Sequence, residues 1–130
     1  MNRYYEIRCK RDIKLFEEAT NCLHDGYITS VEYHNSGIDA RDGYTDFDYK
    51  KTSLAIRILV TSLGEKPTVE LRFENIVDWQ IISPHNEVLN SVFSFGKNGI
   101  IVWADADDVD EQIICDSTFA AAKQIFWRIM

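Results

Sequence analysis

The sequence predicts an α+β fold: a mostly antiparallel β-sheet that curls into a sandwich or open barrel, with one N-terminal helix packed on it. Three observations support this class. Apolar and polar residues alternate in several segments, one stretch near the N-terminus has helical spacing, and an Asn98-Gly99 turn separates two β-prone runs. The 130 residues contain no repeat, linker or compositional break, so we expect one domain, residues 1–130.

Residues 68–82, TVELRFENIVDWQII, show the clearest alternation in the chain, which is typical of a half-buried strand. The predicted buried residues are Val69, Leu71, Phe73, Trp79 and Ile81, and the predicted exposed residues are Glu70, Arg72 and Asp78. Asn75 and Ile76 break the pattern, because a polar residue falls inside and an apolar one outside. We therefore predict a bulge or sharp bend there, within one bent strand or between two strands.

Helical spacing begins at Asp12, a residue type that favours the N-cap position. The apolar positions that follow are Ile13, Leu15, Phe16, Cys22 and Leu23. Gly26 is suited to end a helix in the left-handed conformation. The sequence therefore predicts one amphipathic helix between Asp12 and Gly26.

Further strands are predicted on both sides of a long polar loop. Residues 27–34 and 54–60 alternate, and residues 63–66 connect the second run to the central segment as a hairpin. Residues 35–51 are polar and contain glycine, so we expect a loop with room for a short strand around residues 44–49.

Asn98-Gly99 predicts a hairpin between SVFSFGK and IIVWA, because both residues tolerate a positive φ. A two-residue loop would pair Phe95 with Val102, whereas a four-residue loop would pair it with Ile100. These registers differ by an even number, so in both of them one face carries Phe93, Phe95, Ile100 and Val102.

The two ends of the chain carry weaker patterns. Residues 1–11 are interpreted as an edge strand or a loosely docked arm, and residues 113–115 as a short strand. In residues 119–129 three alanines favour a helix, whereas apolar residues on alternating positions favour a strand with two apolar faces. We favour the strand.

The formal net charge of −7 argues against nucleic acid as a partner, because phosphate backbones repel an acidic protein. Opposite charge steers association, so a protein partner is expected, and a basic one in particular. Three spaced cysteines without a C-x-x-C pair are typical of reduced thiols in the cytoplasm. The N-terminus has no signal-peptide core and no apolar run could span a membrane, so we expect a cytoplasmic protein without membrane association.

His24 and Asp25 are the candidate polar site, because a histidine beside a carboxylate can perform acid–base chemistry. They lack a nucleophile and a third group, so no catalytic residue is assigned. The alternative, which we favour, is that His24 caps the end of the helix and Asp25 opens a turn with Gly26.

Two acidic loops are the candidate partner-binding surfaces. Their residues are Asp105, Asp107, Asp108, Asp110 and Glu111 in the first loop, and Asp39 and Asp42 in the second. Carboxylates suit calcium or magnesium, but the first loop lacks the glycine and distal glutamate of an EF-hand. A solvated loop is the better interpretation, and we predict no metal site and no cofactor.

Leu23-His24-Asp25-Gly26, followed by Ile28 and a strand, resembles the L-H-D-x-x-I opening of many small uncharacterised bacterial proteins. Those proteins also contain a strand similar to LRFENIVDWQI and an ending similar to AKQIFWR, residues 122–128. They resemble immunity proteins encoded beside secreted bacterial toxins. Over about residues 23–129, the resemblance implies a small β-rich module that binds one partner without a cofactor and has no established catalytic residues.

Three functions stay open at this point. The first is a non-catalytic protein-binding module, such as an immunity protein that neutralises a bacterial toxin. The second is a small ligand-binding or metal-dependent enzyme that uses His24 and Asp25 or the 105–111 loop, and a deep pocket holding two of these side chains would favour it. The third is a structural subunit of a homo-oligomer joined through an edge strand.

Overall fold

The computed structural model of the protein describes residues 3–41, 43–82 and 86–130. Ten strands are present there: β1 (Tyr5–Ile7), β2 (Gly26–Asn35), β3 (Ile38–Arg41), β4 (Tyr44–Phe47), β5 (Thr52–Leu59), β6 (Thr68–Gln80), β7 (Glu87–Val88), β8 (Ser91–Phe95), β9 (Ile101–Asp105) and β10 (Phe119–Ile129). The helices are α1 (Lys10–Thr20) and α2 (Glu111–Cys115), with short 3-10 turns η1 (Asn21–Leu23), η2 (Tyr49–Lys51), η3 (Thr61–Leu63) and η4 (Lys97–Gly99).

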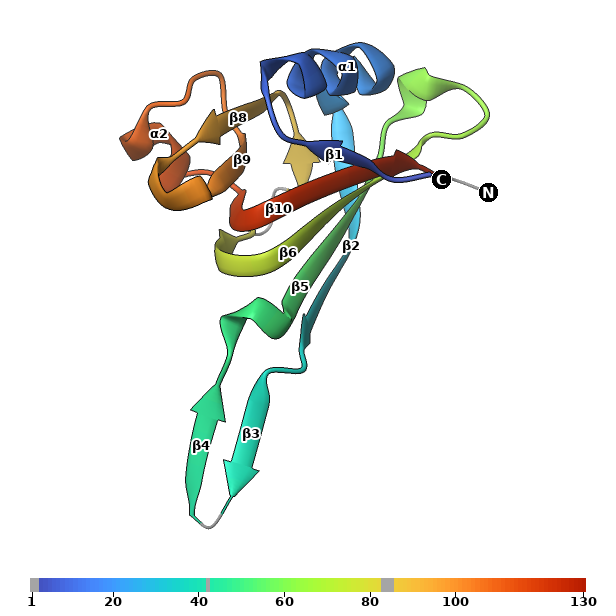
Figure 1. Ribbon diagram of the computed structural model, residues 1–130. Helices are drawn as coiled ribbons and strands as arrows, with labels where there is room; N and C mark the ends of the chain where they lie inside the picture. Colours follow the sequence, from blue (N-terminus) through green and yellow to red (C-terminus); the bar gives the residue numbers. More distant parts are fainter. Residues whose placement is uncertain (1–2, 42, 83–85) are drawn as a thin grey trace.

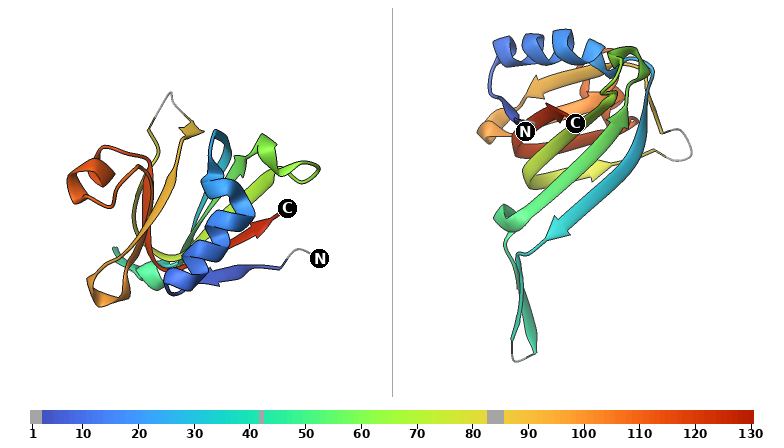
Figure 2. Two further views of the ribbon diagram at one scale, coloured as in Figure 1. Left: turned by 90° about the horizontal axis from the view of Figure 1, so that it is seen from above. Right: turned by 90° about the vertical axis from the view of Figure 1, so that its right-hand side faces the viewer.

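Eight of these strands form one sheet in the order β7-β2-β5-β6-β10-β9-β8, with β1 paired to β10. Each pairing of the described strands is antiparallel. The sheet curves strongly and resembles an open barrel (Figures 1 and 2). The predicted class, a mostly antiparallel sheet of the sandwich or barrel type with a helix, is confirmed.

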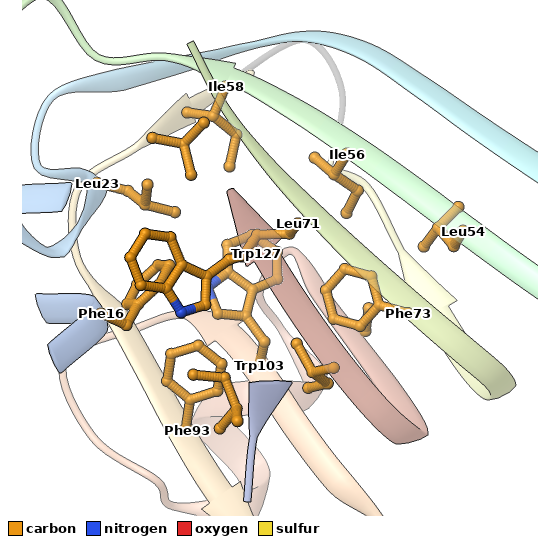
Figure 3. Packing of buried hydrophobic residues seen from close by; sticks show 14 of the residues in the cluster. Phe16, Leu23, Leu54, Ile56, Ile58, Leu71, Phe73, Phe93, Trp103 and Trp127 are labelled. Carbon is orange, nitrogen blue, oxygen red and sulfur yellow. The ribbon is translucent and has the colours of Figure 1, made fainter. Parts of the chain in front are cut away.

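The core lies on the concave side of the sheet (Figure 3). The inward-facing residues of β5 and β6 are fully buried, as their alternation predicts: Leu54, Ile56, Ile58, Val69, Leu71 and Phe73. From α1, the ring of Phe16 packs edge-on against Phe93 and Trp127, at centroid distances of 5.2 and 5.5 Å. Full burial of side chains of this size contributes about 1.5–3 kcal/mol each, so these rows dominate the stability of the fold.

Both predicted ends of the helix are wrong. The N-cap residue is Cys9, and Asp12 lies in the first turn, where its carboxylate accepts a hydrogen bond from the Arg8 N–H at 2.9 Å. The helix ends at Asn21, which has a left-handed φ of 55°. Gly26 instead begins β2, where an added Cβ would lie 2.7 Å from Cγ2 of Ile58. Leu15, predicted to widen the apolar stripe, points into solvent.

The bulge predicted in residues 68–82 is confirmed, but the burial predicted beyond it is wrong. Asn75 has a φ of 57°, and the β6–β10 register shifts between Ala121 and Ala122. Ile76 thereby turns inward, and its N–H donates to Oγ1 of Thr52 at 3.0 Å. Beyond this point Trp79, predicted to be buried, is 36% exposed.

The other predictions for this segment have mixed outcomes. Asp78 is exposed as predicted, whereas Ile81, predicted to be buried, and Arg72, predicted to be exposed, are both half-buried. Glu70 was predicted to be exposed but is buried, at 2% relative exposure. The alternation identifies the two faces of the strand correctly, but it does not show that residues of the N-terminal arm also cover part of the outer face.

The β8–β9 hairpin has a register that neither predicted loop allows. Asn98 and Gly99 have positive φ values of 63° and 72°, as expected. Phe95 pairs with Ile101, however, because residues 96–100 form the loop and the Gly96 N–H donates to the Ile100 carbonyl at 2.8 Å. The odd register puts Ile101 and Trp103, rather than Ile100 and Val102, into the core beside Phe93.

Residues 35–51, expected to be mainly a loop, contain a hairpin of β3 and β4. Ile38 pairs with Phe47 and Arg41 with Tyr44, and the two strands form a separate sheet. Figure 1 shows this hairpin extending away from the main sheet. At its base the Asp48 N–H donates to the Gly37 carbonyl at 2.9 Å. The two backbones approach so closely that a Cβ on Gly37 would lie 2.1 Å from the backbone carbonyl oxygen of Asp48.

The ends of the chain meet in the sheet. The edge strand expected in residues 1–11 is β1, which pairs with β10 so that Tyr5 lies opposite Trp127. The favoured strand in residues 119–129 is confirmed, since β10 lies between β6 on one side and β9 and β1 on the other. Residues 113–115 are helical in α2, so the strand predicted there is wrong; Asp110 caps this helix by accepting from the Gln112 N–H at 2.9 Å.

Candidate functional site

A groove of about 530 Å³ opens beside the bulge of β6. Its wall combines residues from β2, β4, η2, β6, β10 and the β8–β9 turn: Tyr33, Phe47, Tyr49, Ile76, Val77, Asp78, Trp79, Asn98, Ile100 and Lys123. We call it the aromatic groove. Four of these residues are aromatic, and each of the four is partly exposed. A concave, mainly apolar surface with a few polar groups is the usual form of a binding site.

Two residues of the aromatic groove, Val77 and Trp79, follow the bulge in β6. After the bulge, Val77 and Trp79 are 49% and 36% exposed instead of buried. The indole of Trp79 stacks on the ring of Tyr33, with centroids 5.8 Å apart and planes at 27°. Tyr33 is 42% exposed, so the stacked pair presents a preformed aromatic surface to solvent.

The projecting hairpin extends this apolar surface. Phe47 of β4 lines the aromatic groove and is 56% exposed, and Ile38, paired with it on β3, is exposed as well. Tyr44 near the tip of the hairpin is also exposed. These side chains extend away from the core and add exposed apolar area next to the aromatic groove.

The charged side chains of the aromatic groove, Lys123 and Asp78, bond to nearby backbone groups. Lys123 donates a hydrogen bond to the backbone carbonyl of Asn98. The Asp78 carboxylate accepts one from the backbone N–H of Trp79 at 2.9 Å. In the part of the chain that the structure describes, the groove lining contains no serine, cysteine or histidine. Both polar side chains are thus engaged with backbone groups of the groove wall.

His24 and Asp25 lie outside the aromatic groove, at the start of β2. Their side chains are exposed, with Nε2 of His24 3.5 Å from Oδ2 of Asp25. Nδ1 of His24 lies 2.7 Å from the Leu89 carbonyl, a distance at which it donates a hydrogen bond. The backbone N–H of His24 donates to the Asn21 carbonyl and closes η1. The histidine therefore joins the end of the helical region to the segment between β7 and β8.

The first acidic loop divides into a structural part and an exposed part. Asp105 ends β9, and its Oδ1 accepts from the N–H groups of Leu89 and Asn90 at 2.9 and 3.2 Å. Burial raises the pKa of Asp105, although these two bonds act in the opposite direction. A pocket of about 270 Å³ includes Asp105 together with Glu87 and Asp116. The exposed part of the loop consists of Asp107, Asp108, Asp110 and Glu111.

In the second acidic loop, Asp39 lies on β3. Its carboxylate forms an exposed ion pair with Arg41, at 3.0 Å from the guanidinium. Asp42 lies outside the described residues. His24 and Asp105 both bond to backbone groups of Leu89, whereas Asp39 lies on the projecting hairpin. Neither Asp39 nor His24 lines the aromatic groove.

A buried carboxylate on the convex side of the sheet was not predicted. Glu70 of β6 accepts hydrogen bonds from Tyr4 and from Nε of Arg57 at 3.0 Å, and Nε of Arg128 lies 3.3 Å away. The Arg128 guanidinium also lies over the ring of Tyr4, 4.5 Å from its centroid. Burial acts to raise the pKa of Glu70, but the bonds from Tyr4, Arg57 and Arg128 outweigh it and lower that pKa. The cluster fastens the N-terminal arm to the sheet.

No protein-family model, curated protein or solved structure matches this chain. Within residues 3–41, 43–82 and 86–130, no three His, Cys, Asp or Glu side chains gather as metal ligands would. No helix of the described segments is long and apolar enough to cross a membrane.

Proposed function

We propose that this protein is a non-catalytic protein-binding module and that the aromatic groove is its main contact surface. The observation that carries the proposal is the gathering of Tyr33, Phe47, Tyr49 and Trp79, all partly exposed, around one groove beside an apolar hairpin. Exposed aromatic side chains in a preformed recess are typical of the residues that dominate the binding energy of protein interfaces.

The electrostatics support a basic partner. The protein has a net charge of −7, and the exposed carboxylates of the 105–111 loop increase the density of negative charge at its surface. Charges at the rim of an interface mainly raise the rate of encounter, whereas aromatic residues at its centre slow dissociation. In this proposal the acidic loops raise the rate of association, and the aromatic groove slows dissociation.

The sequence resemblance to immunity proteins makes a secreted bacterial toxin the partner that we propose first. The segments that carry the resemblance are the 23–26 turn, β6 and β10. Two of these contribute to the groove wall, with Trp79 from β6 and Lys123 from β10. Production of the protein together with the product of a toxin-like gene immediately upstream should restore growth, and the Trp79→Ala variant should not. Failure of the wild-type protein to protect would reject this identity of the partner.

The general proposal is tested by affinity capture from the native host with three baits: the wild-type protein, Trp79→Ala and Tyr27→Ala. Tyr27 is an exposed aromatic residue of β2 that does not line the aromatic groove, so it provides the matched control. Mass spectrometry should identify one protein retained by the wild type and by Tyr27→Ala but lost with Trp79→Ala. Equal retention by all three baits would show that the groove is not the contact surface.

A further inference from the structure

Strand β2 lies at the margin of the main sheet, where no strand of the described residues pairs with most of its outer side (Figure 2, right). β7 pairs with only its first two residues, Gly26 and Tyr27, and the Ile28 N–H donates to the Asn86 carbonyl at 2.7 Å. Among the residues that the structure describes, the rest of β2 pairs with β5 alone. We call Thr29–Asn35 the open edge; it contains neither proline nor lysine, the residues that commonly protect such edges.

The direction of the backbone groups along the open edge follows from the hydrogen bonds at its end. The Ser36 N–H donates to the Lys51 carbonyl at 3.1 Å. The backbone N–H and C=O groups of Ser36 therefore point toward the chain that continues β5. Antiparallel pairs alternate, which directs the backbone of Glu32 toward β5 and that of Val31 and Tyr33 away from it. The Val60 N–H donates to the Pro67 carbonyl at 2.6 Å, so Val60 and every second residue before it in β5 direct their backbone groups toward β6. The residues between them, including Ala55 opposite Glu32, direct theirs toward β2, in agreement with the assignment above.

The side chains of the open edge have two chemically different faces. Val31 and Tyr33 lie opposite Ile56 and Leu54, so they share the concave face, and Tyr33 is also part of the aromatic groove. Glu32 lies on the convex face and is exposed. A strand added at this edge would therefore place alternate side chains beside the groove and, between them, one side chain opposite Glu32.

We propose, on the basis of the protein-binding function above, that the partner contributes an extended segment that pairs with Val31 and Tyr33 as an additional strand. Its apolar side chains lie beside the aromatic groove, and a basic side chain between them lies opposite Glu32. Addition of a strand to an exposed sheet edge is a common mode of peptide recognition, in which backbone bonds give affinity and alternate side chains give specificity. A second copy of the chain carries the same net charge of −7, so charge complementarity favours a basic partner.

The probe is a nine-residue peptide, acetyl-STTVKVTTS-amide, whose lysine can lie opposite Glu32 and whose valines can lie opposite Val31 and Tyr33. Binding should slow hydrogen exchange of the Val31 and Tyr33 amides in the full-length protein at least tenfold. The Glu32 amide, already bonded to β5, should change little. A counterpart with glutamate in place of lysine should bind at least fivefold more weakly at low salt.

Two methylated peptides separate strand addition from simple contact with the aromatic groove. N-methylation of both valines removes the donors that would face β2 and should weaken binding at least tenfold. N-methylation of the lysine alters an N–H that points away from β2 and should leave binding within about threefold. Equal affinity of the two methylated peptides would overturn the inference.

The remaining outcomes also decide the question. Absence of binding at millimolar peptide, or binding without protection of Val31 and Tyr33, would overturn strand addition. If that binding shifts only the indole signal of Trp79, the groove remains a contact surface and the proposed function stands. Protection of the two amides that grows with protein concentration in the absence of peptide would show that a second copy occupies the edge, and this too would overturn the proposal.

Discussion

Replacement of Glu70 by alanine removes the acceptor that holds the N-terminal arm against the sheet. The Glu70 side chain is 3% exposed, and it receives bonds from Tyr4, Arg57 and Arg128. Loss of one partner from a fully buried ion pair costs about 3–5 kcal/mol. The side chains of Arg57 and Arg128 are 42% and 25% exposed, so both recover part of their hydration when the carboxylate is lost. We therefore expect a loss of about 2–3 kcal/mol in the free energy of unfolding.

Urea unfolding followed by tryptophan fluorescence measures this loss. For a domain of this size it corresponds to a fall of roughly 10 °C in the midpoint of thermal unfolding. Tyr4→Phe should cost about 1 kcal/mol, and the double variant should cost less than the sum of the two single variants, because both remove the same contact.

The matched control is Glu74→Ala, on the same face of the same strand. Glu74 pairs with Arg72, and both side chains are more exposed than that of Glu70, so its removal should cost less than about 1 kcal/mol. If Glu70→Ala destabilises the protein no more than Glu74→Ala does, Glu70 is not the anchor of the arm.

Three other predictions follow from the same structure. Because the folded-state pKa of Glu70 is lowered, its stabilisation should be complete above the ordinary carboxyl value of 4.5 and disappear as the pH falls through the lowered pKa; unfolding curves of the wild type and Glu70→Gln should converge there. Gly26→Ala should cost about 1–3 kcal/mol, because its Cβ would lie 2.9 Å from the Leu23 carbonyl oxygen; stability within about 0.5 kcal/mol of the wild type would contradict this close approach. Reversal of Asp107 and Asp108 to lysine should slow association with a basic partner and flatten its salt dependence in stopped-flow measurements, with unfolding changed by less than about 0.5 kcal/mol; an unchanged rate would show that the loop does not steer binding.

The sequence predicts the fold best where the strands are regular. Alternation identifies the buried rows of β5 and the first half of β6, because side chains of a regular strand point to opposite faces in turn. It fails beyond Asn75, where one left-handed residue and a shift of register interrupt the regular alternation. The prediction for the β8–β9 hairpin is wrong for a related reason. Residues 98–99 alone do not determine the length of the loop, and an odd change of register moves each side chain of β9 to the other face of the sheet.

The aromatic groove could not be predicted from any local pattern. Its wall combines residues that are far apart in the sequence, from Tyr33 to Lys123. The pairing of distant strands brings these residues together. The signal that was present is the interruption at Asn75 and Ile76, which marks the bulge that exposes Trp79. The Glu70 cluster was missed because Tyr4, which covers it, lies 66 residues away in the sequence.

The binding affinity of the captured partner for the wild type, Trp79→Ala and Tyr27→Ala, measured by titration calorimetry, tests the central claim most directly. A central aromatic residue of an interface is typically worth at least 2 kcal/mol, so Trp79→Ala should raise the dissociation constant about 30-fold or more. Tyr27→Ala, at an exposed site outside the groove, should leave it within about twofold. If Trp79→Ala changes the dissociation constant no more than Tyr27→Ala does, the aromatic groove is not the contact surface.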